Sequence, residues 1–453
     1  MISLARTKNH IFKRRRHIGF LAFSVMAHDT MAFSAGHSSS TCFPYEPPSW
    51  AEAMFANVPP NGRLKLGNFP TPLYKVTGVS ERKYEDDDTS SSILGRLEEL
   101  KIRLYIKRDD MSGGVETGGN KIRKLEFLLA DAIARDYDSV VTIGGEQSNH
   151  CRATAAASRM VRLEPHLILR TRKADAIQEQ DGDIGYTGNI LFDRMVGSSI
   201  YTCTPGEYGR IGSTALVKGL CDYLKQKNKD CKPYAIPVGG SNGIGTWGYI
   251  NGVEEFLSQW NTIEEEESLD HLIFACGSGG TAAGIALGVA CAFKNEATKP
   301  EVHAIGVCDS PDYFYGHVSE IAEEMGFQAP NGSSSIESFV RESMIVHQGR
   351  GLGYATSTPE ELQFIKKFAI ETGIVLDPVY SGKALFNFLK PILETDEAEL
   401  YRGKSILFWH TGGALGLFEN GNDIDFQSAA KRLDVYGKGF DNGVDISMSK
   451  SKR

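Results

Sequence analysis

The sequence Cys276-Gly277-Ser278-Gly279-Gly280-Thr281-Ala282-Ala283-Gly284 begins at the end of an apolar run over His271–Cys276 and leads into an expected helix over Thr281–Ala292. A strand, a turn of small residues and a helix in this order place free backbone N–H groups and the positive end of a helix dipole at one point. Such a point suits a phosphate, to which the hydroxyls of Ser278 and Thr281 can also donate. A tight turn packed closely for steric reasons is the alternative. We favour the phosphate because α/β sheets bind ligands at the carboxyl ends of their strands.

Short β-branched runs alternate with amphipathic stretches on both sides of this loop. This alternation is typical of a mainly parallel sheet built from strand–helix–strand units, so we predict an α/β fold. The expected strands are Leu104–Lys107, Ser139–Ile143, His166–Arg170, Ser199–Cys203, Tyr234–Val238, His271–Cys276, Val302–Val307 and Ser405–Trp409. The expected helices are Lys121–Arg135, Asn149–Met160, Thr214–Lys225, Thr281–Ala292, Pro359–Glu371 and Gly382–Leu393.

Lys121 stands in the first turn of an expected helix, within Gly118-Gly119-Asn120-Lys121-Ile122-Arg123-Lys124. The positive end of the helix dipole disfavours a protonated amine there, so the lysine tends toward the free amine. A free amine is a nucleophile suited to a Schiff base with an aldehyde cofactor. A solvated cationic face shared with Arg123 and Lys124 is an equally good interpretation of the spacing alone.

A further loop, Gly144-Gly145-Glu146-Gln147-Ser148-Asn149-His150, also follows an apolar strand and opens a helix. With Ser148 as N-cap, Asn149 and His150 offer backbone N–H groups and side-chain donors to an anion such as a carboxylate. Plain helix capping would explain Ser148 but not the whole cluster.

Two other glycine-containing stretches are weaker signals. Gly114–Lys121 resembles a nucleotide P-loop, but Asn120 separates the glycine from the lysine and Ile122 stands where Ser or Thr should hold magnesium. Gly243–Gly248 matches G-x-G-x-x-G, but Trp247 inside the turn argues against a dinucleotide. We interpret Gly243–Gly248 as a substrate-side or packing loop.

The composition excludes several classes of function. The 453 residues carry a net charge of −8 without a basic face, so we expect no nucleic-acid partner. No apolar run approaches the roughly 20 residues that span a bilayer, so we expect no membrane segment. The eight cysteines are scattered, with no C-x-x-C pair and no His/Cys cluster at zinc spacing, so we expect reduced thiols and no metal. Glycine supplies 48 residues, above the usual share of about 7%, as expected where backbone approaches a phosphate.

The first 45 residues differ from the remainder. Six of them are Lys or Arg and one is acidic, and serines are frequent. This composition favours a targeting segment for the mitochondrion, or alternatively the plastid, over secretion, because the cysteines do not form a disulfide framework. Tyr84–Ser92 is an acidic, Ser-rich surface insertion, and residues 426–453 are expected to form a loose tail.

Taken together, the motifs resemble pyridoxal-phosphate enzymes of the tryptophan-synthase β-subunit fold, and within them the D-cysteine desulfhydrase and 1-aminocyclopropane-1-carboxylate deaminase family. The resemblance covers about residues 46–420. The matching motifs are Lys107–Asp110, Ser112-Gly113, Gly118–Lys121, Gly144-Gly145 with Gln147–Asn149, Cys276–Gly284 and Leu376–Lys383. It implies fold type II, with two open, twisted, mainly parallel sheets flanked by helices. It also implies a homodimer, a large cofactor-binding domain of residues 46–130 and 236–425, and a small domain of residues 131–235.

The resemblance assigns roles to individual residues. It makes Lys121 the Schiff-base lysine and assigns the phosphate to Gly277, Ser278, Gly279, Gly280 and Thr281. Asn149 matches the residue that binds the pyridoxal 3′-oxygen. Ser148, Asn149, His150, Tyr354 and Tyr380 match the substrate side, and Lys121, Ser148, Tyr354 and Tyr380 match the catalytic set. His150 departs from the glutamine of many deaminases.

Ser381 and Thr411 distinguish the activities of this family. The deaminases carry glutamate and leucine where this sequence has Ser381 and Thr411, and the desulfhydrases resemble this sequence. Neutral hydroxyls near the cofactor's ring nitrogen stabilise a carbanion less than a carboxylate does, which is sufficient for β-elimination. We therefore expect β-elimination of D-cysteine to pyruvate, hydrogen sulfide and ammonia. The alternatives are the deaminase, another eliminase or racemase of this fold, and a non-catalytic pyridoxal-phosphate carrier.

Overall fold

The computed structural model describes residues 42–77, 92–179, 182–263, 268–294, 299–329, 333–420 and 423–424. The expected targeting segment, the acidic insertion and the expected tail lie almost entirely outside these residues. Only residues 42–45 of the expected targeting segment and Ser92 of the acidic insertion are described, and the expected tail of residues 426–453 is outside.

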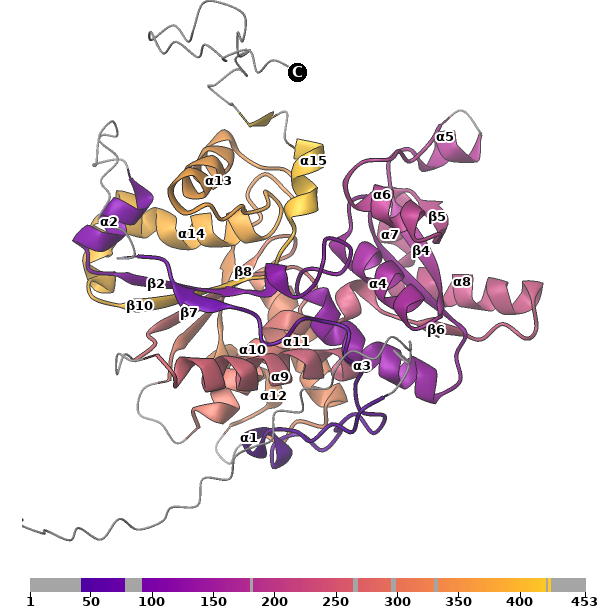
Figure 1. The fold of residues 1–453 in the computed structure, drawn as a ribbon, viewed down its shortest axis with the longest axis horizontal. Helices are drawn as coiled ribbons and strands as arrows, with labels where there is room; N and C mark the ends of the chain where they lie inside the picture. The colour runs from indigo at the N-terminus through magenta and orange to yellow at the C-terminus, as the bar shows by residue number, and fades with distance from the viewer. Residues whose placement is uncertain are drawn as a thin grey trace, which may run out of the picture. The chain divides into compact units, whose positions relative to one another are not determined.

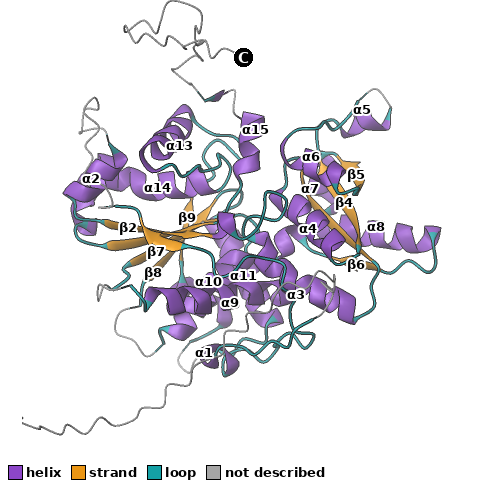
Figure 2. Cartoon of the chain, in the orientation of Figure 1, coloured by secondary structure: helices purple, strands orange, loops and turns teal. Residues whose placement is uncertain are grey.

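The larger sheet has six strands in the order β1-β2-β10-β7-β8-β9. β1 is antiparallel to β2, and the other neighbours are parallel. Its central strands are apolar along their length because helices cover both faces, as Figures 1 and 2 show. The strands are Leu73–Lys75 (β1), Arg103–Arg108 (β2), His271–Cys276 (β7), Glu301–Gly306 (β8), Ile345–Gln348 (β9) and Ser405–His410 (β10).

The smaller sheet has four parallel strands in the order β5-β4-β3-β6. All four come from one continuous stretch of chain, which the larger sheet's strands flank on both sides. The strands are Ser139–Gly145 (β3), Glu164–Arg170 (β4), Ser199–Cys203 (β5) and Pro233–Ala235 (β6).

Helices enclose both sheets (Figure 1). In the larger sheet, Leu272 and Phe274 of β7 belong to the core shared with α9 and α10, whereas Ile273 and Ala275 belong to the core shared with α13 and α14. Among the described residues, no helix is long and apolar enough to cross a membrane. The helices are Ser49–Glu52 (α1), Ile93–Glu99 (α2), Lys121–Ala134 (α3), Asn149–Met160 (α4), Ala174–Gln178 (α5), Gly188–Met195 (α6), Pro205–Ile211 (α7), Ser213–Lys227 (α8), Gly243–Trp260 (α9), Gly280–Ala292 (α10), Pro311–Glu324 (α11), Ile336–Ser343 (α12), Pro359–Thr372 (α13), Ser381–Glu394 (α14) and Leu417–Asn420 (α15).

The stretch Gly243–Gly248 corrects one sequence prediction, because it begins the long helix α9 and is not a loop. A Cβ on Gly248 would lie 2.3 Å from the carbonyl oxygen of Arg123, so the glycine lets α9 pack directly on α3. Trp247 is fully buried in the same turn. The packing part of the prediction was right, and tertiary contact overrides the low helix propensity of glycine.

A buried ionic network joins α3 to α9 and to the residues after β2. Arg123 on α3 donates two hydrogen bonds to Asp109, at 2.9 and 2.8 Å, and two to Glu255 on α9, both at 2.9 Å. Asp109 also accepts from the hydroxyls of Thr71 and Tyr249. Burial by itself raises the pKa of Asp109, but the Arg123 guanidinium holds this pKa below its ordinary value.

We predict that Asp109→Asn lowers the free energy of unfolding by about 3–5 kcal/mol, because it leaves two buried cations, Arg123 and Lys107, sharing the carboxylate of Glu255. Urea denaturation measures this difference. Glu337→Gln is the control, since Glu337 pairs with Arg341 at the surface, and it should cost less than about 1 kcal/mol. Equal effects of the two substitutions would mean that the network does not hold α3 in place.

Candidate active site

A cavity of about 600 Å³ lies where strands of both sheets end. Gly144 and Gly145 of β3 line it together with Cys276 of β7, and Thr411 lines it just after β10. The cavity therefore lies at the carboxyl ends of parallel strands, where the sequence analysis expected a ligand.

Most of the predicted site residues line this cavity, although they are far apart in sequence. They come from the N-termini of α3, α4 and α10 and from the loops before α13 and α14 and after β10. Two predicted residues, Gly280 and Ser381, are not among those lining it. The lining set is Lys121, Ser148, Asn149, His150, Gly277, Ser278, Gly279, Thr281, Tyr354, Tyr380 and Thr411.

Lys121 is the first residue of α3, and its Nζ donates a 2.9 Å hydrogen bond to the side chain of Asn120. The Asn120 amide in turn donates to the hydroxyl of Thr281, which ties the lysine's neighbour to the glycine loop. Burial, together with the nearby Arg152 cation, lowers the pKa of Lys121 to about 8. A much larger share of this amine is therefore unprotonated near neutral pH than of an ordinary lysine, although the protonated form still predominates.

The solvated-face alternative for this stretch is wrong. Arg123 and Lys124 are each only 1% exposed. The Nζ of Lys124 donates to the carbonyl of Gly239 and to Ser241 Oγ, and burial holds the pKa of Lys124 well below its ordinary value. Lys124 therefore stands behind the glycine loop as a buried amine.

The glycine loop after β7 turns through Gly279, whose φ of +82° is a left-handed conformation that favours glycine. Ser278 accepts a 2.9 Å hydrogen bond from the Ser241 hydroxyl, and this bond holds the side chain of Ser278 in place. The N–H of Gly280 donates to Ser241 Oγ at 3.1 Å, so Gly280 braces the loop from behind and does not face the cavity.

The N-terminus of α4 forms a second side of the cavity. The Ser148 hydroxyl accepts from the N–H of Cys151 at 3.1 Å and caps the helix. The side-chain oxygen of Asn149 is buried and has no hydrogen-bond partner among the described residues. His150 has its ring nitrogens near the hydroxyls of Thr142 and Thr154, and burial holds its pKa well below 6.5. His150 therefore lines the wall as a neutral ring.

Two tyrosines close the opposite side of the cavity. The hydroxyls of Tyr354 and Tyr380 lie 2.6 Å apart, and burial raises the pKa of both. The Arg170 guanidinium lies 5.6 Å from the ring centre of Tyr354. The pair can therefore deliver one proton into the cavity through a short hydroxyl–hydroxyl contact.

Ser381 does not occupy the position that the sequence analysis gave it. Its hydroxyl donates to Asp377 at 2.6 Å and accepts from the Asp377 N–H at 2.8 Å. Asp377 also accepts the N–H of Tyr380 at 2.8 Å. Ser381 therefore closes the turn before α14 and sets the direction of Tyr380, while Thr411 alone of the predicted pair lines the cavity.

Several residues at or beside this site were not predicted from the sequence, among them Lys124, Arg170 and Ser241. Lys124 lies three residues after Lys121 on the same helix, so the two side chains could have been expected on one helix face. Arg170 ends β4 and pairs in register with Gly145, so it lies beside the predicted loop after β3. Ser241 gave no signal, because its contact with the glycine loop bridges residues far apart in sequence.

Residues 64–412 match the family described as pyridoxal-phosphate dependent enzymes. The chain belongs to this family. It is 42% identical over 88% of its length to a protein of Arabidopsis thaliana named bifunctional D-cysteine desulfhydrase/1-aminocyclopropane-1-carboxylate deaminase, mitochondrial, of which the match covers 91%. It is 32% identical over 79% of its length to the D-cysteine desulfhydrase of Salmonella typhi, covering 95% of that protein.

Structural comparison gives the same relationship. A solved structure described as a homologue of 1-aminocyclopropane-1-carboxylate deaminase superposes with a TM-score of 0.61 at 29% identity. The match covers 80% of this chain and 95% of that one. The fold is therefore type II of the pyridoxal-phosphate enzymes, as the sequence analysis predicted.

The residues of the cavity fit the family's cofactor, pyridoxal phosphate. The Lys121 amine suits the aldehyde, and the loop of Gly277 to Thr281 at the start of α10 suits the phosphate. The unpartnered oxygen of Asn149 leaves that amide available to the ring. Each part of the cofactor thus has a matching group on this chain.

We predict that the cofactor-free protein takes up pyridoxal phosphate at a rate that rises with pH and levels off above about 8, because Lys121 loses its proton there. An ordinary lysine would level off only near 10.5. The measurement is incorporation against pH, trapped by borohydride. Arg152→Gln should move the midpoint upward by removing the neighbouring cation, and a midpoint unchanged from an ordinary lysine would contradict the assignment.

We predict that Ser381→Ala lowers the free energy of unfolding by about 1–3 kcal/mol without changing the absorbance of the bound cofactor, because the hydroxyl pairs with Asp377. Chemical denaturation and absorbance spectra measure both effects. Ser338→Ala, at an exposed serine, is the control. A changed absorbance with unchanged stability would return Ser381 to the cofactor.

Proposed function

We propose that this protein eliminates hydrogen sulfide from D-cysteine, giving pyruvate and ammonia. The observation that carries the proposal is the buried Lys121 amine, which lines one cavity with the Tyr354–Tyr380 pair and the α4 N-terminus. A base, a proton donor and a carboxylate site are the groups that β-elimination from an amino acid requires. The names of the Arabidopsis and Salmonella relatives support the same reaction.

Pyridoxal phosphate, when bound, withdraws electrons from the substrate's α-carbon and so acidifies its α-proton. Lys121 accepts that proton at Nζ, for which an amine with a pKa near 8 is suited. The phosphate is held by the Gly277–Thr281 loop, with Lys124 behind it. Asn149 holds the cofactor ring through its side-chain amide.

The substrate carboxylate is held by the first turn of α4, capped by Ser148, where backbone N–H groups and the helix dipole favour an anion. His150 contributes the shape of the wall rather than a charge, because it is neutral. Tyr380, supported by the Tyr354 hydroxyl, donates a proton to the sulfur as the carbon–sulfur bond breaks. Hydrolysis of the remaining fragment then releases pyruvate and ammonia.

Deamination of 1-aminocyclopropane-1-carboxylate is the second candidate, because the Arabidopsis relative carries both activities in its name. Thr411 favours the elimination: it brings a hydroxyl to the cavity, and a hydroxyl stabilises a pyridinium less than a carboxylate does. Elimination requires only a short-lived carbanion. Ser381 favours neither reaction, since its hydroxyl bonds to Asp377.

Import into the mitochondrion is proposed from the basic first 45 residues, and the name of the Arabidopsis relative, which includes the word mitochondrial, supports it. The plastid is the alternative. The homodimer and the division into a large and a small domain stay predictions from the resemblance.

We predict that the purified protein releases sulfide and pyruvate from D-cysteine in equal amounts, and less from L-cysteine. Lys121→Ala should lower kcat by about 10²–10⁴-fold, because the base is removed. Lys218→Ala, at an exposed lysine on α8, is the matched control and should leave kcat unchanged. Release of 2-oxobutyrate from 1-aminocyclopropane-1-carboxylate without sulfide from D-cysteine would replace the first candidate by the second.

A further inference from the structure

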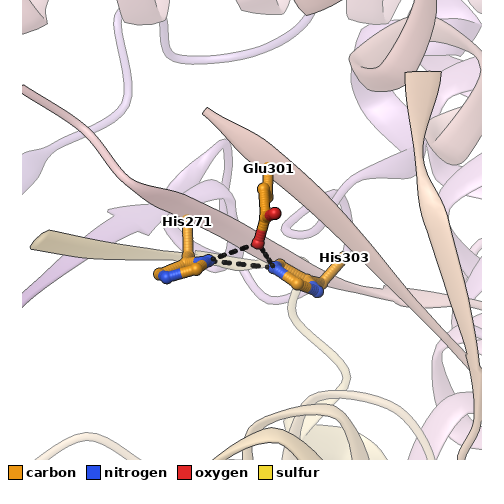
Figure 3. A group of neighbouring side chains, drawn as sticks. All are labelled: His271, Glu301 and His303. Atoms are coloured by element: carbon orange, nitrogen blue, oxygen red, sulfur yellow. Dashed lines mark hydrogen bonds and ion pairs between the residues drawn. The ribbon is translucent and has the colours of Figure 1, made fainter. Parts of the chain in front are cut away.

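Three side chains with metal-binding atoms converge at the amino ends of β7 and β8 (Figure 3). His271 is the first residue of β7 and is paired in register with Glu301, the first residue of β8. His303 lies two residues after Glu301, so its side chain projects from the same face of the sheet. The strand register therefore brings His271 next to Glu301 and His303, which lie 30 and 32 positions later in the sequence.

The distances within this cluster match a metal's coordination shell. His271 Nδ1 lies 3.1 Å from His303 Nε2 and 3.3 Å from Glu301 Oε2, and His303 Nε2 lies 3.7 Å from Glu301 Oε2. Ligand atoms at about 2.0–2.2 Å from a tetrahedral zinc ion lie about 3.3–3.5 Å apart. The three observed distances lie within about 0.2 Å of this range.

The surroundings of the cluster hold the two rings in place. His303 Nδ1 lies 2.9 Å from His347 Nε2 on β9, and this contact leaves His303 Nε2 turned toward the cluster. A metal-binding histidine usually has such a partner on its other nitrogen. The side chains of His271 and His303 are 11% and 5% exposed, whereas that of Glu301 is 61% exposed, so the cluster opens to solvent on the carboxylate side.

The cluster is separate from the active-site cavity. β7 runs from His271 to Cys276, which lines the cavity, and five residues of strand span about 17 Å. None of the three residues lines the cavity, and they form the single His/Cys/Asp/Glu group of this kind in the described part of the chain.

We propose that His271, Glu301 and His303 bind one Zn²⁺ ion, with water as the fourth ligand, and that the ion clamps β7 to β8. Two imidazole nitrogens and one carboxylate oxygen are a donor set that zinc accepts. The rival interpretation is a chain of hydrogen-bonded neutral imidazoles running from His271 through His303 to His347, which requires no metal.

The β4 strand supplies a matched control. Glu164 and His166 repeat the Glu-x-His pattern of Glu301 and His303, and Glu164 is exposed as Glu301 is. The residue opposite Glu164 is Ser139, however, where the zinc cluster has His271. Glu164→Gln therefore removes a similar carboxylate where no second histidine faces it.

The test is calorimetric titration of the full chain, loaded with pyridoxal phosphate and stripped of metal by a chelator, with Zn²⁺. We expect one Zn²⁺ per chain and a melting temperature that rises with Zn²⁺. Glu301→Gln and His303→Asn should weaken binding at least about tenfold, and His347→Phe by about 10–100-fold. Glu164→Gln should bind as the unaltered protein does.

Each outcome decides between the two interpretations. Glu301→Gln changes a largely exposed side chain, so the fold survives, and unchanged cofactor absorbance verifies this. The zinc site is overturned if no stoichiometric Zn²⁺ binds, or if Glu301→Gln and Glu164→Gln bind Zn²⁺ equally. In that second case the ion would sit elsewhere, for example at the cavity cysteines Cys276 and Cys308. Loss of binding in Glu301→Gln and His303→Asn, with binding kept in Glu164→Gln, supports the clamp.

Discussion

The ion pair between Arg123 and Asp109 is the interaction on which the position of the active-site lysine depends. Arg123 is two residues beyond Lys121 on α3, and its guanidinium is held by carboxylates from two other elements, Asp109 and Glu255. A buried arginine of this kind cannot rotate away without leaving charges unpaired in the interior. The first turn of α3 is thereby fixed relative to the sheet, and Lys121 with it.

Rigid placement of α3 also explains how a buried amine can exist there. Lys121 and Lys124 lie on one face of the helix, near Arg152, and burial keeps the pKa of both lysines low. The glycine at position 248 lets α9 lie directly on this helix, which excludes water from the region. The fixed position of α3 thus keeps two buried amines beside the glycine loop, where burial disfavours their charged forms.

The sequence predicted the parts of the site that are local. Strand, loop and helix follow one another at Gly144–His150 and at Cys276–Gly284, so the pattern alone predicted a ligand-binding loop at the carboxyl end of each strand. The sequence could not orient a hydroxyl: Ser381 is in the right turn but faces Asp377. It also could not reveal the cluster of His271, because that cluster depends on the register of two strands and not on spacing.

Because the strands are parallel, the amino and carboxyl ends of the larger sheet's strands differ in the charge that the neighbouring helix dipoles favour. Helix α14 begins at the cavity beside Tyr380 and runs back toward the amino ends of the strands, where Phe388 contacts His303. The positive end of its dipole therefore lies at the cavity, and its C-terminal carbonyl groups lie toward the amino ends of the strands. The same polarity holds for α10, whose N-terminus follows the glycine loop that lines the cavity. This polarity favours an anionic cofactor at the carboxyl ends of the strands. It also favours a cation at their amino ends, where His271 lies.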